Sequence, residues 1–277
     1  YAVINRIFLE HTRELGDTLA AIAEDKSHVI TGEQKCVYFA EQEPEVLEVL
    51  VRRAEAMQVP YKIYGRDFQA ENIRYTYSGM LFNVVIGDNI YPDLQIPLLG
   101  EHQAKNCALA LAVCMDVMAD LCRKSDTLYI FSDTMCNQIR RQLSAIHLPG
   151  RMEILSSDPF VLLDACINSA SCENVKDVLR HLGIQNCTVI VGIPEDKDYA
   201  GVVRSMKDVA ARIILTRSGN PHYHFSQHQR EVLMQEGILT EWTDSVKQAL
   251  NLANSFSDAI VILGTTSVIS ETEQEIR

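Results

Sequence analysis

Four side chains in the first half of the chain are of types that bind metal ions, phosphates or bases. His11 carries an imidazole, which in its neutral form is a common metal ligand, and Lys26 carries an amine. The amine of a lysine takes up carbon dioxide only in its uncharged form, which burial favours. Gln103 and Asn106 are three residues apart in a helical pattern and therefore share one helix face. Gly100 precedes that helix, whose first amides favour anions.

Three polar residues in the second half follow a break in the pattern at Leu148-Pro149-Gly150. Arg151 comes directly after the break. Asp164 and Asn168 stand at the end of a strand-like run and just beyond it. Ligands of open α/β sheets bind at the carboxyl ends of the strands, where a carboxylate can meet a ribose hydroxyl. The structural alternative for each of these residues is an ordinary cap, turn or solvated side chain.

Composition excludes several classes of function. The chain has 277 residues, which fits two compact domains, and a formal net charge of -12. A surface this acidic repels nucleic-acid backbones and anionic lipids, so we expect neither nucleic acid nor membrane as a partner. No apolar run is long enough to cross a bilayer, and no secretory signal is visible.

The cysteines indicate a reducing compartment. They form no C-x-x-C pair and no spacing typical of a zinc site. We therefore expect reduced, buried thiols and a cytoplasmic protein. The cysteines are Cys36, Cys107, Cys114, Cys122, Cys136, Cys166, Cys172 and Cys187.

Hydrophobic periodicity predicts an α/β architecture. In the first half it indicates strands at 2–8, 35–40 and 61–64, helices at 17–24, 45–57 and 102–121, and hairpins at 73–90. In the second half it indicates strands at 160–163, 188–191, 211–216 and 259–263, and helices at 172–182, 199–209, 226–236 and 245–255.

Alternation in the second half is typical of parallel βαβ units. We expect a first domain at 1–146 and a small Rossmann-like second domain at 147–277. Because the chain opens inside a predicted strand at Tyr1, the first domain is expected to be incomplete at its front.

Four segments together resemble the Mur ligase superfamily and, within it, the folylpolyglutamate and dihydrofolate synthases. They are 9–30, with L-E-H-T-R-E-L-G-D-T and I-A-E-D-K; 64–68, Y-G-R-D-F; 97–112, with L-L-G-E-H-Q-A-K-N; and 147–169, with L-P-G-R-M-E and D-A-C-I-N-S. The resemblance implies the C-terminal part of a P-loop-type ATPase domain, followed by the family's C-terminal domain.

By this resemblance, His11 binds the catalytic Mg²⁺, and Lys26 is a catalytic lysine that is often carbamylated. The chain departs from the family pattern at Glu10, where the family has Asp, and at Ser27-His28, where it has Ala-Gly. The second change is larger, because glycine permits a close approach of the backbone.

The nucleotide-binding roles that the resemblance implies fall on five residues. Gln103 and Asn106 would meet the adenine. Arg151 would reach the phosphates and count among the catalytic residues, and Asp164 and Asn168 would complete the nucleotide site.

The reaction that the resemblance implies is ATP-dependent amide formation. ATP phosphorylates a carboxylate, and the amino group of glutamate attacks the acyl phosphate; the acceptor is a folate or dihydropteroate. ATP and Mg²⁺ are the implied cofactors. Nothing in the chain matches the phosphate-binding pattern G-x-x-x-x-G-K-[ST], so we expect it to make no acyl phosphate alone.

Two interpretations stay open. The first is a fragment of an active ligase. The second is a catalytically inactive relative that binds a nucleotide or a partner, because Ile167 stands where the family has a histidine and offers no hydrogen-bonding atom. A nicotinamide-linked dehydrogenase is a distant third, since no G-x-G-x-x-G follows a predicted strand.

Overall fold

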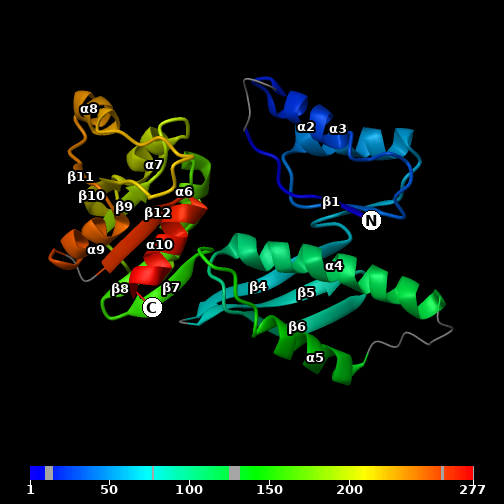
Figure 1. Ribbon diagram of the computed structural model, residues 1–277. Helices are drawn as coiled ribbons and strands as arrows, with labels where there is room; N and C mark the ends of the chain where they lie inside the picture. The colour runs from blue at the N-terminus through cyan, green and yellow to red at the C-terminus, as the bar shows by residue number, and fades with distance from the viewer. Residues whose placement is uncertain (10–14, 77, 125–131, 257–258, 277) are drawn as a thin grey trace. The chain divides into compact units, whose positions relative to one another are not determined.

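The computed structural model describes residues 1–9, 15–76, 78–124, 132–256 and 259–276 (Figure 1). It divides into two compact units. Unit 1 comprises Tyr1–Arg74, Met80–Ile96 and Glu101–Ala145, and unit 2 comprises Tyr75–Gly79, Pro97–Gly100 and Ile146–Arg277.

Unit 1 contains a three-stranded parallel sheet in the order β1-β2-β3. Its strands are β1 (Ala2–Ile4), β2 (Val37–Phe39) and β3 (Tyr61–Ile63), and its connecting helices are α2 (Leu19–Ser27) and α3 (Pro44–Ala56). All three residues of β2 are buried, as expected for a strand covered on both faces. Val37 and Phe39 pack with α2 and α3 in one hydrophobic cluster.

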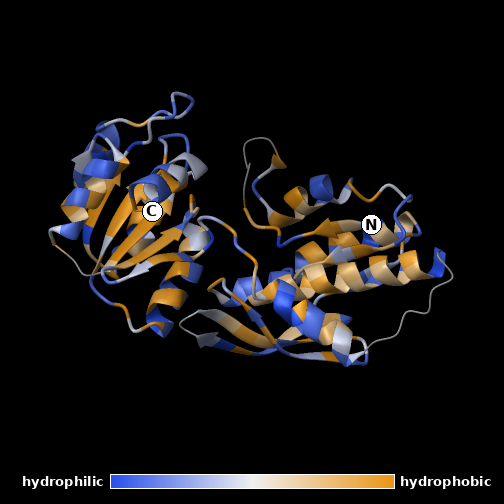
Figure 2. Cartoon of the chain, turned by 60° about the horizontal axis from the view of Figure 1, so that its bottom comes forward, coloured by the Kyte–Doolittle hydropathy of each residue, from blue (hydrophilic) through white to orange (hydrophobic). Residues whose placement is uncertain are grey.

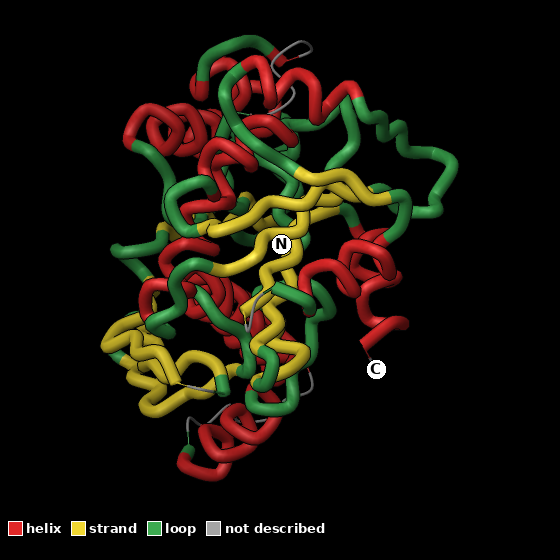
Figure 3. The backbone as a smooth tube through the Cα atoms, turned by 90° about the vertical axis from the view of Figure 1, so that its left-hand side faces the viewer, coloured by secondary structure: helices red, strands yellow, loops and turns green. Residues whose placement is uncertain are grey.

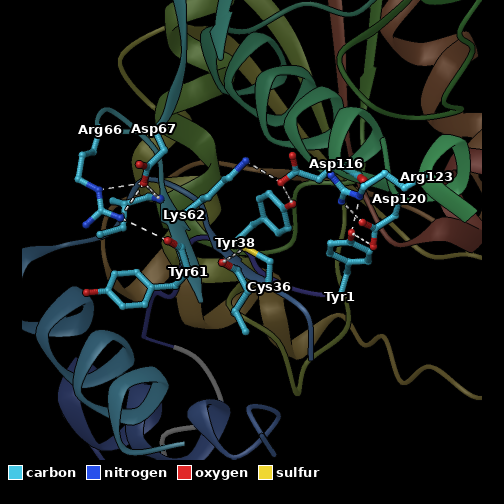
Figure 4. A network of polar contacts seen from close by, with 12 residues as sticks. Tyr1, Cys36, Tyr38, Tyr61, Lys62, Arg66, Asp67, Asp116, Asp120 and Arg123 are labelled. Atoms are coloured by element: carbon cyan, nitrogen blue, oxygen red, sulfur yellow. Dashed lines mark hydrogen bonds and ion pairs between the residues drawn. The ribbon is translucent and has the colours of Figure 1, made fainter. Parts of the chain in front are cut away.

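The opposite face of this sheet is held to α4 (Glu101–Lys124) by a polar network (Figure 4). Tyr38, buried at the centre of β2, donates its hydroxyl proton to Asp116, which also forms an ion pair with Lys62 Nζ at 2.6 Å. Tyr1 donates to Asp120 at 2.6 Å, and Lys35 pairs with the same carboxylate. Asp116 and Asp120 are one helical turn apart and so anchor α4 along one stripe.

An antiparallel sheet in the order β4-β5-β6 follows, with β4 (Phe68–Thr76), β5 (Gly79–Ile86) and β6 (Asn89–Ile96). Helix α5 (Asp133–Leu143) begins at its cap Ser132, whose hydroxyl accepts from the Met135 amide. The Arg140 guanidinium donates to the Pro92 carbonyl at 2.7 and 3.0 Å and so ties α5 to β6.

Unit 2 is built on a six-stranded sheet in the order β11-β10-β9-β12-β8-β7. The strands are β7 (Glu153–Ser157), β8 (Phe160–Asp164), β9 (Cys187–Gly192), β10 (Ala210–Thr216), β11 (Glu241–Thr243) and β12 (Ala259–Gly264). Only β7 runs antiparallel to its neighbour; the other pairings are parallel. The carboxyl ends of five strands therefore share one edge of the sheet.

Helices cover both faces of this sheet (Figures 1 and 3). They are α6 (Ser169–His181), α7 (Tyr199–Met206), α8 (His228–Gln235), α9 (Val246–Asn254) and α10 (Thr266–Ile276). Apolar residues of α9 and α10 pack with Leu163, Ile190 and Ile262 from the strands. Strands β8, β9 and β12 are accordingly buried along nearly their whole length, and hydrophobic residues predominate in the sheet in Figure 2.

The α/β class was predicted correctly, but several elements differ. The strand predicted at 2–8 ends at Ile4, because Gln42 and Asn5 take over its backbone groups: Gln42 Oε1 accepts from the Ile7 amide at 2.9 Å, and Asn5 Oδ1 accepts from the Arg6 amide. Strands β7 and β11 and helix α10 were not predicted at all.

Candidate functional site

Lys26 lies in the last turn of α2 and lines a cavity of about 390 Å³. The cavity walls come mainly from the segment that leaves the carboxyl end of β1, including Asn5, Arg6 and Phe8. Helix α2 is placed by its cap Thr18, whose Oγ1 accepts from the Ala21 amide at 3.2 Å. The cavity thus sits at the edge where parallel α/β sheets bind ligands. His11, which was predicted as a metal ligand, lies outside the described residues.

Gln103 and Asn106 both lie in the first turns of α4. Gln103 is buried and Asn106 is half-buried. Gly100, with φ +101°, lets the chain turn immediately before the helix. Lys105, between them in sequence, forms ion pairs with Glu41 at 2.8 Å and Glu101 at 3.3 Å. The helix start therefore presents two amide side chains and a lysine that is neutralised by two carboxylates.

The turn that carries Arg151 closes onto the end of β8. The Met152 amide donates to Asp164 Oδ2 at 2.9 Å, and the Ala165 amide donates to the Gly150 carbonyl at 2.8 Å. Gly150 has φ +63°, and a Cβ built there would meet Ile269 Cγ2 of α10 at 2.5 Å. Only glycine fits this position, so the turn holds exposed Arg151 beside the Asp164 carboxylate.

Asp164 is a buried carboxylate with 7% of its surface exposed. Burial raises its pKa to about 6, although hydrogen bonding from the Met152 amide and the charge of Arg151 oppose the shift. A carboxylate whose charge is this poorly solvated favours a hydrogen-bond donor or a cation as a further partner.

Asn168 has an identified structural function. It is the N-cap of α6, and its Oδ1 accepts from the Ser171 amide at 2.9 Å and from the Ser171 hydroxyl at 3.0 Å. The neighbouring Ser169 amide donates to Asp198 Oδ2 at 2.9 Å. Ile167 is half-buried in the same loop.

Two buried hydroxyl groups belong to residues that were not predicted as site residues. Ser218 follows β10 and Thr265 follows β12, each 6% exposed, and within the described residues neither hydroxyl oxygen has a hydrogen-bond partner. The loop after β10 is fixed to α10, because Asn220 Nδ2 donates to Ser267 Oγ at 2.8 Å. These hydroxyls therefore lie at the carboxyl edge of the sheet near a helix start, where a small anion is favoured.

The signal for these residues was present in the sequence. Thr265 follows a glycine directly after the strand predicted at 259–263, and Ser218-Gly219-Asn220-Pro221 is a polar turn directly after the strand predicted at 211–216. The sequence did not indicate that these two hydroxyl groups are buried. Their burial is what distinguishes them from ordinary polar groups in surface turns.

The structure brings Arg151 and Asp164 together in unit 2, with Asn168 four residues beyond. Lys26, Gln103 and Asn106 belong to unit 1. A further group of potential metal ligands, also in unit 2, consists of His147, Glu153 and Glu273, whose ligand atoms lie within 4.8 Å of one another. One oxygen of Glu153 already accepts from the Gly150 amide at 2.9 Å, so this group also braces the turn.

Two protein-family models match the chain in succession. The Mur ligase middle domain matches residues 1–114, and the Mur ligase glutamate ligase domain matches residues 150–266.

Curated relatives extend the similarity to most of the chain. A probable bifunctional folylpolyglutamate synthase/dihydropteroate synthase of Haloferax volcanii is 27% identical, covering 98% of this chain and 31% of the relative. A folylpolyglutamate synthase of Lacticaseibacillus casei is 25% identical, covering 99% of this chain and 61% of the relative. The chain thus spans between about a third and three fifths of the length of these relatives.

A solved structure shows the same fold. Mycobacterium tuberculosis folylpolyglutamate synthase, complexed with ADP and AMPPCP, superposes with a TM-score of 0.81 at 22% identity, covering 98% of this chain and 62% of that one. Within the described residues, no helix is both long and apolar enough to cross a membrane.

Proposed function

This chain belongs to the Mur ligase superfamily, in its folylpolyglutamate synthase-like branch, and we propose that it carries the nucleotide- and amino-acid-binding parts of an ATP-dependent carboxylate–amine ligase. The observation that carries the proposal is the buried carboxylate of Asp164, which the Met152 amide holds at 2.9 Å near the charge of Arg151, in a turn that only glycine permits. A carboxylate with a purely structural function would not need to be buried as a charge here, because burying a charge costs free energy.

The proposed reaction forms an amide in two steps. The terminal phosphoryl group of ATP passes to a carboxylate of a folate or dihydropteroate, giving ADP and an acyl phosphate. The amino group of glutamate then attacks the acyl carbon, and inorganic phosphate leaves. Catalysis of such transfers depends on positioning and on stabilising charge, so the roles below are electrostatic.

In unit 2, Arg151 supplies a fixed guanidinium for phosphate oxygens, and Asp164 accepts a hydrogen bond from a ribose hydroxyl. Asn168 is proposed to act mainly by capping α6 and so by holding this loop in place. The family histidine has no counterpart, because Ile167 cannot form a hydrogen bond.

In unit 1, Gln103 and Asn106 are proposed to contact the adenine, and Lys26 to hold phosphate or metal from the cavity at the end of β1. Mg²⁺, when bound through His11, would neutralise phosphate charge during transfer. The cavity walls are compatible with an anionic ligand, since Lys26 and Arg6 both line it, although Arg6 also pairs with Glu43 at 3.0 Å.

Glutamate is proposed to bind at the carboxyl edge of unit 2. The hydroxyls of Ser218 and Thr265 lack partners within the described residues, and the first amides of α10 favour a carboxylate. A small amino acid would satisfy both kinds of group, which is how buried polar groups are normally accommodated.

We further propose a cytoplasmic location. None of the eight cysteines, all of which fall among the described residues, forms a disulfide, and five of them are buried. Reduced thiols are typical of proteins in reducing compartments.

A second candidate function is binding without catalysis, and Ile167 is the observation that favours it. One experiment separates the two. The complete gene product is incubated with Mg²⁺, ATP and glutamate, with and without dihydropteroate or a folate. An active ligase releases phosphate and forms a glutamylated product only with the acceptor. Binding of ATP without product formation supports the inactive relative.

A further inference from the structure

Two buried thiols touch each other beside the Asp164 loop. Cys166 Sγ lies 3.5 Å from Cys172 Sγ, and the two residues are 2% and 0% exposed. Cys166 follows β8, and Cys172 lies in the first turns of α6. Both sulfurs also approach the Asn168 carbonyl oxygen, at 3.3 and 3.6 Å, so one backbone group holds the pair in place.

This pair is connected to Asp164 through a short stretch of backbone. Hydrogen bonding from the backbone of Cys166 stabilises the charged Asp164 carboxylate, in addition to the bond from Met152. The Ala165 amide, one residue earlier, donates to the Gly150 carbonyl. A displacement of Cys166 is therefore transmitted directly to the carboxylate and to the Arg151 turn.

We propose that Cys166 and Cys172 form a reversible disulfide, with hydrogen peroxide as the oxidant, and that this disulfide weakens ligand binding at Asp164. The second half of this statement rests on the proposed nucleotide site. A disulfide has a sulfur–sulfur distance of about 2.05 Å, so the two sulfurs must approach by roughly 1.5 Å, which pulls Cys166 toward α6.

The reaction balances in two steps. One cysteine, as the thiolate, attacks a peroxide oxygen, giving a sulfenic acid and, with the released proton, water. The second thiol attacks the sulfenic sulfur, the sulfur–sulfur bond forms, and a second water leaves. The two sulfurs are oxidised by two electrons in total, and the peroxide is reduced to two molecules of water.

The surroundings also set the rate of this oxidation. The shared hydrogen bond with Cys172 and burial both raise the pKa of the Cys166 thiol, so little thiolate is present near neutral pH. Oxidation is therefore slower than at the exposed Cys114. A small neutral oxidant such as peroxide reaches the buried pair more readily than a bulky disulfide does.

The pairing is tested by peptide mapping of the full chain. Protein is treated with graded hydrogen peroxide, unfolded, alkylated and digested with trypsin, which cuts after Arg151 and Lys176 and leaves both cysteines on one peptide, 152–176. We expect this peptide to lose both alkyl groups together and to regain both after dithiothreitol. Unchanged alkylation of 152–176 after prolonged treatment, at peroxide doses well above those that oxidise Cys114, would overturn the proposal.

Cys187 is a matched control within the same sample. It is also fully buried, burial raises its pKa to about 11, and its sulfur donates to the Val209 carbonyl rather than to a thiol. Cys187 should be alkylated to the same extent with and without peroxide. In a Cys172→Ala variant, peroxide should no longer protect Cys166 from alkylation through a disulfide that dithiothreitol reverses. A disulfide between Cys166 and another cysteine in the peptide map of that variant would show that Cys166 pairs elsewhere and would refute the assignment.

Ligand binding is then measured on the same preparations with a fluorescent ATP analogue. The oxidised protein should bind about tenfold more weakly than the reduced protein, as expected for losing a hydrogen bond to a charged group. Cys172→Ala should bind equally with and without peroxide. Equal binding by the oxidised and reduced wild-type protein refutes the switch. Absence of binding in both forms refutes the nucleotide site instead, while the peptide map still reports the disulfide.

Discussion

The Met152 amide donates a hydrogen bond of 2.9 Å to Asp164 Oδ2, although 12 residues separate them in the chain. Met152 adopts φ +49°, a conformation that side chains larger than glycine rarely take. The turn is held in this form by the hydrogen bond and by the packing of Gly150 against Ile269. The proposed nucleotide contacts of Arg151 depend on this arrangement.

Asp164→Asn should make the protein more stable and its proposed site weaker. The variant keeps an oxygen that accepts from Met152 but removes the buried charge. In the folded protein the Asp164 pKa is about 6, so the folded state holds a proton that the unfolded state has released between about pH 4 and pH 6. Wild-type stability is therefore greatest below this window and falls as pH rises through it.

The size of the effect follows from the shift. Between about pH 4 and pH 6, the wild-type protein should lose about 3 kcal/mol of its free energy of unfolding, because one pKa unit is equivalent to about 1.4 kcal/mol. Urea unfolding of both proteins at several pH values measures it. The free energy of unfolding of the variant, relative to wild type, should rise between pH 4 and pH 7. A difference that does not change with pH would contradict the burial of a charged group at Asp164.

Gly150→Ala should destabilise the protein more than Gly183→Ala. Both glycines have positive φ, +63° and +70°, so both variants carry the same backbone cost. Only at Gly150 does the new methyl group meet Ile269; at Gly183 it meets nothing within 4 Å. The difference in free energy of unfolding should be about 1–3 kcal/mol, the usual cost of overpacking. Equal losses would show that the Gly150 turn moves freely.

Asn168→Ala should cost about 1 kcal/mol of stability, the typical value for a lost N-cap. Asn168→Ser restores an oxygen that can cap α6 and should recover most of that stability and, with it, ATP-analogue binding. Thermal unfolding and ligand titration of the two variants give both quantities. Full stability with weak binding in the serine variant would instead indicate that the Asn168 amide touches the ligand.

Asp116→Ala should loosen α4 from the β1-β2-β3 sheet. Its carboxylate accepts from the buried Tyr38 hydroxyl and pairs with Lys62. Losing this acceptor should cost about 1–3 kcal/mol, because a buried donor is left without a partner. Tyr38→Phe removes that donor, so the double variant should be less destabilised than the sum of the single ones, by about 0.5–3 kcal/mol. Additive losses in chemical unfolding would show that the contact contributes nothing.

Local sequence patterns predicted the elements of unit 2 correctly where the apolar pattern of a segment matches its burial in the structure. The runs that became β9, β10 and β12 each contain at least three consecutive apolar residues, and alternating helices follow them, so the βαβ succession of unit 2 was predictable. Strand β11 is only three residues long and β7 pairs at an antiparallel edge, so neither gives a strong periodic signal. Helix α10 carries three glutamates and has too narrow an apolar stripe to stand out in sequence.

The candidate site was predictable only as a set of residue types. The motif around Arg151 predicted the turn. It did not predict that the Met152 amide would reach Asp164, because that contact depends on tertiary packing. The sequence assigned Asn168 to the nucleotide, whereas its amide oxygen is engaged by Ser171. The burial of Ser218 and Thr265 and the contact between Cys166 and Cys172 likewise arise only when distant segments meet.

The most direct test of the proposed ligase is the acceptor dependence of phosphate release by the complete gene product, measured together with mass spectrometry of the products. With Mg²⁺, ATP, glutamate and dihydropteroate or a folate, we predict that one phosphate is released for each glutamate added, and that both signals are lost in Arg151→Ala. Phosphate release that does not depend on the acceptor, or the absence of a glutamylated product under all conditions, would contradict the proposed ligase activity.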